Sequence, residues 1–100
     1  MREQDAPARP REWDLVYDKA ESICRTVLAE RAGQFHKWGD QTHTHEAWIA
    51  ILEEELAEAK CKVACDYETD EIFKEIIQVA AVAIAWADDM VRRGSVVEER

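Results

Sequence analysis

The segment from Ile76 to Ala87 has a single polar residue, Gln78. The chain contains only 3 Gly and 2 Pro, which favours long helices over a turn-rich β fold, so we assign this segment to a helix. A helix that is apolar on all sides must be buried on most of them. A chain of 100 residues with three helices cannot enclose it completely. The segment therefore predicts an all-α protomer that completes four-helix bundles by oligomerisation, as a dimer or a tetramer.

Apolar residues recurring every three or four positions predict three helices, over residues 12–37, 45–66 and 70–92. Thr44 and Thr69 are the expected N-caps, and Gly94 is the expected residue after the last helix. Residues 1–11 are expected to form a flexible arm, residues 12–94 one helical domain, and residues 95–100 a polar tail. Trp13, Trp48 and Trp86 are expected to pack against other helices, whereas His43 and His45 are expected at the surface or at a cap.

Composition excludes several classes of function. The chain carries 13 Lys and Arg against 22 Asp and Glu, a net charge of −9, and an acidic surface repels duplex nucleic acid. No apolar run approaches the ~20 residues of a membrane span, and the N-terminus lacks the apolar core of a signal peptide. Three cysteines, Cys24, Cys61 and Cys65, indicate a reducing compartment, so a cytoplasmic protein is expected. Cys61 and Cys65 are predicted to be small core residues.

Two pairs of oxygen ligands border the apolar stripes of the last two helices. Glu55 and Glu58 are three residues apart, as are Glu75 and Gln78, and this spacing places both members of a pair on one side of a helix. Carboxylates beside a core are costly unless they are paired or bind a metal ion. Only three lysines lie near them in sequence, so we expect a divalent cation, rather than protein, to balance their charge. The nearby lysines are Lys60, Lys62 and Lys74.

Oxygen ligands without a convergent His or Cys set favour Mg²⁺, or Mn²⁺, over zinc. The alternative interpretation is that both pairs are solvated, because Glu is a good helix former and E-x-x-E is common on helices.

These residues carry a resemblance to a known family. Glu55-x-x-Glu58, sixteen intervening residues and then Glu75-x-x-Gln78 resemble the carboxylate motif of the MazG-like, all-α nucleoside triphosphate pyrophosphohydrolases. The flanking sequences I-L-E-E-E-L-A-E-A-K, E-I-I-Q-V-A-A-V-A-I-A-W and Q-F-H-K-W-G-D-Q-T-H also resemble the compact phage and actinobacterial members. The similarity covers about residues 29–89. One position departs from the usual pattern, because Gln78 stands where the family usually has Asp.

The resemblance implies Mg²⁺-dependent hydrolysis of a nucleoside triphosphate to the monophosphate and pyrophosphate. Two or so metal ions would be held by Glu55, Glu58, Glu75 and Gln78. Glu54 or Glu55 would orient or deprotonate the attacking water. The other candidate substrate-binding residues are His36, Lys37, Trp38 and Asp89, of which Trp38 would stack on a base or anchor the loop.

Three alternatives stay open from the sequence. A glutamine at position 78 carries no charge, which favours a non-catalytic helical module of the same fold that binds a nucleotide or a protein partner. A purely structural helical oligomer would bind no Mg²⁺. A di-iron carboxylate bundle is disfavoured because the E-x-x-H pairs of such sites are absent.

Overall fold

The computed structural model describes residues 10–96, without the side chains at positions 10, 11 and 13. Three helices account for most of this range: α1 (Pro10–Trp38), α2 (His45–Ala64) and α3 (Thr69–Arg92). No strand occurs in the described part, so the predicted all-α class is confirmed. Within the same range, no helix combines the length and the hydrophobicity that crossing a bilayer demands.

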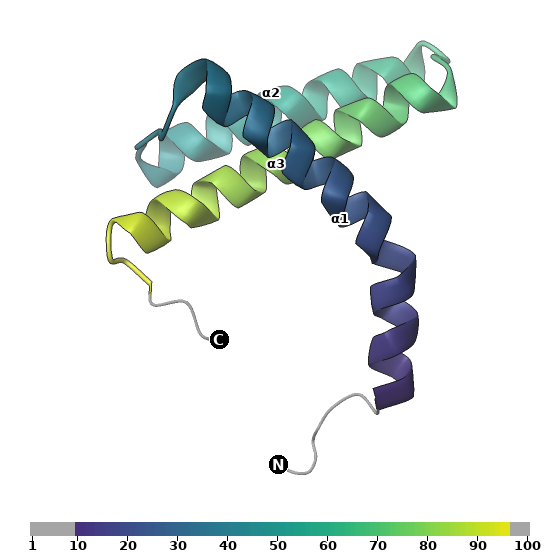
Figure 1. Ribbon diagram of the computed structural model, residues 1–100. Coiled ribbons are helices and arrows are strands. Elements are labelled where there is room, and N and C mark those ends of the chain that lie inside the picture. Colours follow the sequence, from purple (N-terminus) through teal and green to yellow (C-terminus); the bar gives the residue numbers. More distant parts are fainter. Residues whose placement is uncertain (1–9, 97–100) are drawn as a thin grey trace.

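Helix α3 is the central element. Helices α2 and α3 lie side by side, and α1 crosses α3 before its N-terminal part extends away from the other two helices (Figure 1). In the described chain, α1 and α2 both pack against α3 but not against each other. An apolar helix is thus placed where it contacts both neighbours, as the segment from Ile76 to Ala87 requires.

Helix ends follow local sequence signals, with one exception. Thr44 is the N-cap of α2, and its hydroxyl accepts a hydrogen bond of 3.1 Å from the backbone N–H of Ala47, as predicted. Gly94 follows α3 with φ of 76°, a conformation that favours glycine. The prediction that Thr69 caps α3 is wrong, because Glu68 is the N-cap and makes no side-chain capping bond. Helix α1 begins at Pro10, two residues earlier than predicted, and proline suits a first helical turn.

The buried core consists of two small clusters along α3. In the first, Val27 of α1 packs against Ile77 and Ala81. In the second, Trp48 of α2 packs against Val82 and Ala85. Each cluster joins α3 to one neighbour, and together they set the positions of α1 and α2 against it.

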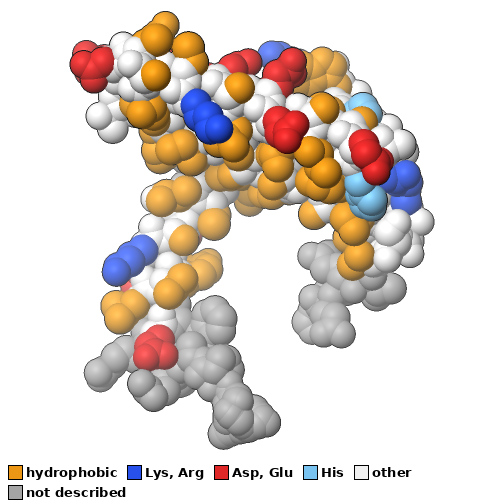
Figure 2. Space-filling view, turned by 180° about the vertical axis from the view of Figure 1, so that it is seen from behind, with side chains coloured by type: hydrophobic (Ala, Val, Ile, Leu, Met, Phe, Trp, Pro, Cys, Tyr) orange, Lys and Arg blue, Asp and Glu red, His pale blue; other side chains and the backbone are white. Residues whose placement is uncertain are grey.

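Many large apolar side chains remain on the surface of this protomer (Figure 2). Ile76 is 54% exposed and Ile84 is 39% exposed, so α3 is not buried all round within a single chain. Of the apolar stripe predicted for α1, only Val27 is buried among the described side chains. The predicted core roles of Cys61 and Cys65 are also wrong, because both thiols are exposed. The side chain of Trp13 lies outside the described residues.

A fully buried carboxylate, Asp89, holds the loop before α2 against the end of α3. Its Oδ2 atom accepts hydrogen bonds from Trp48 Nε1 at 2.7 Å and from the backbone N–H of His43 at 3.1 Å. Arg93 Nε lies 2.8 Å from Oδ1. Burial alone raises the pKa of Asp89, but the bonds from Trp48 and His43 and the charge of Arg93 outweigh it and hold the pKa at about 2.

The hydrogen bond from Trp48 to Asp89 is expected to contribute measurably to folding. Trp48→Phe keeps an aromatic ring but removes the donor, so the free energy of unfolding should fall by about 2 kcal/mol, the typical value of a hydrogen bond to a charged group. Trp86→Phe is the matched control, because Trp86 Nε1 donates to His45 Nδ1 at an exposed position. Its loss should cost less than about 1 kcal/mol. Urea unfolding of both variants tests this, and equal losses would contradict it.

Candidate metal centre and adjoining cavity

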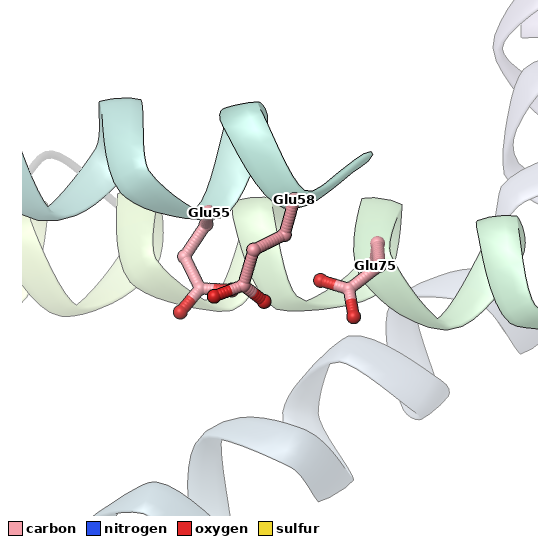
Figure 3. Close-up of side chains that lie close together, drawn as sticks. All are labelled: Glu55, Glu58 and Glu75. Carbon is pink, nitrogen blue, oxygen red and sulfur yellow. The ribbon is translucent and has the colours of Figure 1, made fainter. Parts of the chain in front are cut away.

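Three glutamates from two helices converge on one point. Glu55 and Glu58 project from successive turns of α2, and Glu75 projects from the first half of α3 (Figure 3). One carboxylate oxygen from each lies within 4.8 Å of the other two. Glu75 is buried, Glu55 is half-buried and Glu58 is exposed, so the cluster opens to solvent on one side. The predicted convergence of the two helices is therefore present for these three ligands.

The cluster has the donor set that a hard divalent cation requires. Oε1 of Glu55 and Oε1 of Glu75 are buried and have no hydrogen-bond partner within the described residues. Buried carboxylate oxygens without a partner are costly, and a cation, a proton or a water molecule would satisfy them. Burial raises the pKa of Glu55, and the negative charges of Glu58 and Glu75 raise it further. Carboxylate oxygens are the ligand type that Mg²⁺ and Mn²⁺ prefer.

One protein cation does reach the cluster. Lys62 Nζ lies 3.0 Å from Glu75 Oε2 and 3.6 Å from Glu71 Oε1. The hydrogen bond with Glu75 raises the pKa of Lys62. The expectation that protein leaves the acidic groups unbalanced is therefore wrong for one oxygen of Glu75. It holds for the other oxygen, which is buried and has no hydrogen-bond partner among the described residues.

A cavity of about 450 Å³ adjoins the cluster. Glu55 and Gln78 line this cavity. The second residues of the two predicted ligand pairs therefore differ, because Gln78 lines the cavity and Glu58 does not. Its volume lies within the range of small-molecule sites. The lining comes from α1, the following loop, α2 and α3: Glu30, Arg31, Gly33, Gln34, Lys37, Trp38, Gln41, Trp48, Ile51, Glu55, Gln78, Val82 and Ala85.

Some of the predicted substrate-binding residues line the cavity and others do not. Lys37 and Trp38 line the cavity, and Lys37 Nζ lies 5.4 Å from the centroid of the Trp38 ring. His36 is exposed and is not among the lining residues. Asp89 has no exposed surface and contacts Trp48, His43, Arg92 and Arg93, which gives it a structural role.

Of the two candidate catalytic carboxylates, only Glu55 faces the cavity. Glu54 is exposed and its carboxylate is not part of the cluster, although its charge contributes to the raised pKa of Glu55. A base must lie within reach of the water that it activates. Glu55 therefore occupies the better position of the two.

Several lining residues were not predicted from the sequence. Glu30 and Gln34 are two of them, and with the predicted Lys37 they recur at spacings of four and three positions, which places all three on one side of α1. This polar stripe, beside the buried Val27, is the sequence feature from which the contribution of α1 to the cavity could have been predicted. Glu30 also raises the pKa of Glu55 through its charge, so α1 adds to the negative potential at the cluster.

Comparison of the chain with family models, with curated proteins and with solved structures gave no match.

Proposed function

We propose that this chain is a Mg²⁺-dependent nucleoside triphosphate pyrophosphohydrolase, which converts NTP or dNTP and water to the monophosphate and pyrophosphate. The convergence of Glu55, Glu58 and Glu75, with two buried carboxylate oxygens lacking partners, carries the proposal. The adjoining cavity and the motif resemblance to MazG-like enzymes support it.

In this proposal, one set of residues binds the cation and another set binds the substrate. Glu55, Glu58 and Glu75 would hold the cation, with the Gln78 carbonyl as a neutral fourth ligand. When bound, Mg²⁺ supplies positive charge against the phosphate chain. Arg31 and Lys37 line the cavity and would add positive charge, and Trp38 presents a ring on which a base can stack.

Glu55 is the residue we assign to the attacking water. Glu55 lines the cavity in which a triphosphate would bind, so its carboxylate would lie within reach of the attacking water. In this role it orients the water molecule and accepts its proton. Glu58 and Glu75 then serve only as ligands of the cation.

The direct test is a panel of canonical and modified nucleoside triphosphates, assayed with Mg²⁺ for release of pyrophosphate. We expect pyrophosphate and a monophosphate in equal amounts from at least one substrate, and none in the presence of a chelator. Orthophosphate with a diphosphate would indicate a different bond cleaved. Binding of a nucleotide by calorimetry without turnover would contradict the hydrolase.

The second candidate is a non-catalytic module of the same fold that binds a nucleotide or a protein partner. Two observations favour it: Gln78 contributes no charge, and Lys62 already occupies one oxygen of Glu75. Both lower the affinity of the cluster for a cation. Calorimetry would then show nucleotide binding that is unchanged when the chelator is added.

We also propose that the protomer forms a homo-oligomer whose second copy covers exposed apolar side chains. Ile49, Leu56 and Val63 recur every seven residues on α2 and are all at least 43% exposed. A seven-residue apolar repeat is typical of a helix that packs against another helix. Sedimentation velocity should show a dimer or tetramer, and Leu56→Glu should shift it towards the monomer. A monomeric parent protein would contradict this proposal.

A further inference from the structure

The last turn of α2 carries two thiols that the proposed hydrolase does not use. Cys61 and Cys65 are both exposed and unoxidised, and their Sγ atoms are 4.0 Å apart. The backbone N–H of Cys65 donates to the carbonyl of Cys61 at 2.9 Å, which fixes the two residues one helical turn apart. Buried cysteines are explained by packing, but an exposed pair with facing sulfurs is not.

We propose that Cys61 and Cys65 form a two-thiolate binding site for a thiophilic metal ion, such as Zn²⁺, Cd²⁺ or Cu⁺. Two Zn–S bonds of about 2.3 Å at a tetrahedral angle separate the sulfurs by about 3.8 Å. The observed 4.0 Å is close to that value, so an ion fits between the thiols with little movement. The same i, i+4 spacing places two histidines on one zinc ion in helical H-E-x-x-H sites.

A metal ion fits this pair better than a disulfide does. Cβ atoms one turn apart on a helix are separated by about 5–6 Å. A disulfide requires about 3.5–4.5 Å between them, so oxidation would distort the end of α2. A bridging ion spans the longer gap, because it adds two bonds between the sulfurs instead of one.

Ligand chemistry separates this site from the acidic cluster. Thiolates select soft or borderline ions, whereas carboxylates select Mg²⁺ and Mn²⁺. In the described residues, only the three-glutamate cluster groups three metal-ligating side chains, so the cysteine pair supplies two ligands and water completes the coordination. Binding replaces the two thiol protons, which are released to solvent. Each thiol must lose its proton to bind the ion, so affinity should increase with pH.

Cadmium is a suitable probe, because its bonds to thiolates give an ultraviolet charge-transfer band. The reduced full-length protein is titrated with Cd²⁺ in a buffer that contains excess Mg²⁺ to occupy carboxylates. It should bind one equivalent of Cd²⁺ per chain. Cys61→Ser and Cys65→Ser should each weaken binding by about ten-fold or more, since even the loss of an outer partner costs about 10- to 100-fold. Cys24→Ser is the matched control and should bind as the parent does, because Cys24 lies on α1.

Three results would overturn the site. The band could be absent from the parent, it could survive in both single variants, or one ion could be bound for every two chains, which would mean that thiols of different copies bind it. Both cysteines are exposed, so the serine variants should fold, and circular dichroism checks this. The outcome does not depend on whether the chain hydrolyses nucleotides.

Discussion

Replacing Glu55 with glutamine is expected to lower kcat/KM for Mg²⁺-dependent pyrophosphate release by about 10²- to 10⁴-fold, the range for loss of a general base. The substitution keeps the size of the side chain and removes its charge. It therefore removes a ligand of the cation and the proposed base in one step, while leaving the wall of the cavity in place. Initial rates with the best substrate of the panel measure the loss.

Glu53→Gln is the matched control for this variant. It makes the same chemical change two residues away on the same helix, at an exposed position outside the cluster. Its activity should stay within about two-fold of the parent, as expected for a surface substitution. Glu58→Gln should fall with Glu55→Gln, because both supply oxygens to one ion. Equal activity in the parent and Glu55→Gln would remove Glu55 from the site.

The helices could be predicted from sequence because their signals are local. Apolar spacing and the Thr44 cap depend on residues within a few positions of each other, and α3 ends at Arg92 as predicted. Which side of a helix is buried depends instead on distant residues. On α2, Trp48 and Ala59 face the core, whereas Ile49, Leu56 and Val63 form a second apolar stripe that stays exposed. The hydrophobicity of either stripe alone does not distinguish them.

Part of the candidate site could likewise be predicted from local sequence, and part depends on how the helices pack. The convergence of Glu55, Glu58 and Glu75 could be predicted, because three-residue spacing and an α2–α3 hairpin bring them together. The contact of Lys62 with Glu75 could not, since it depends on how the two helices are aligned and on a long side chain crossing between them. The contribution of α1 to the cavity depends on the angle at which α1 crosses α3, which no short motif records.

The order of stability of the parent and Glu55→Gln should depend on whether a divalent cation is bound at the acidic cluster. Burial and neighbouring charges raise the pKa of Glu55 above its ordinary value of 4.5. A raised carboxylate pKa means that the folded state holds its proton more tightly than the unfolded state. In chelator, the stability associated with Glu55 is thus complete below pH 4.5 and declines as pH rises through the raised pKa.

Glu55→Gln removes this cost, because its side chain has no charge at any pH. Without metal at pH 7.5, the variant should therefore unfold at a higher temperature than the parent. Glu53→Gln, which lies outside the cluster, should match the parent. Thermal unfolding in chelator, followed by circular dichroism at pH 5 and pH 7.5, measures both differences. The gap between Glu55→Gln and the parent should widen at the higher pH.

Mg²⁺ should reverse that order. An ion at 100 times its Kd stabilises a folded protein by about 2.7 kcal/mol. For a domain of this size, such a gain raises the unfolding temperature by about 10 °C or more. The parent and Glu53→Gln should show this rise, and Glu55→Gln should lose most of it because one ligand is gone. If Mg²⁺ raised the unfolding temperature of Glu55→Gln as much as that of the parent, the cation would bind elsewhere. If Mg²⁺ raised the unfolding temperature of neither protein, the cluster would be an acidic surface that binds no ion. That result would contradict the proposed Mg²⁺-dependent hydrolase.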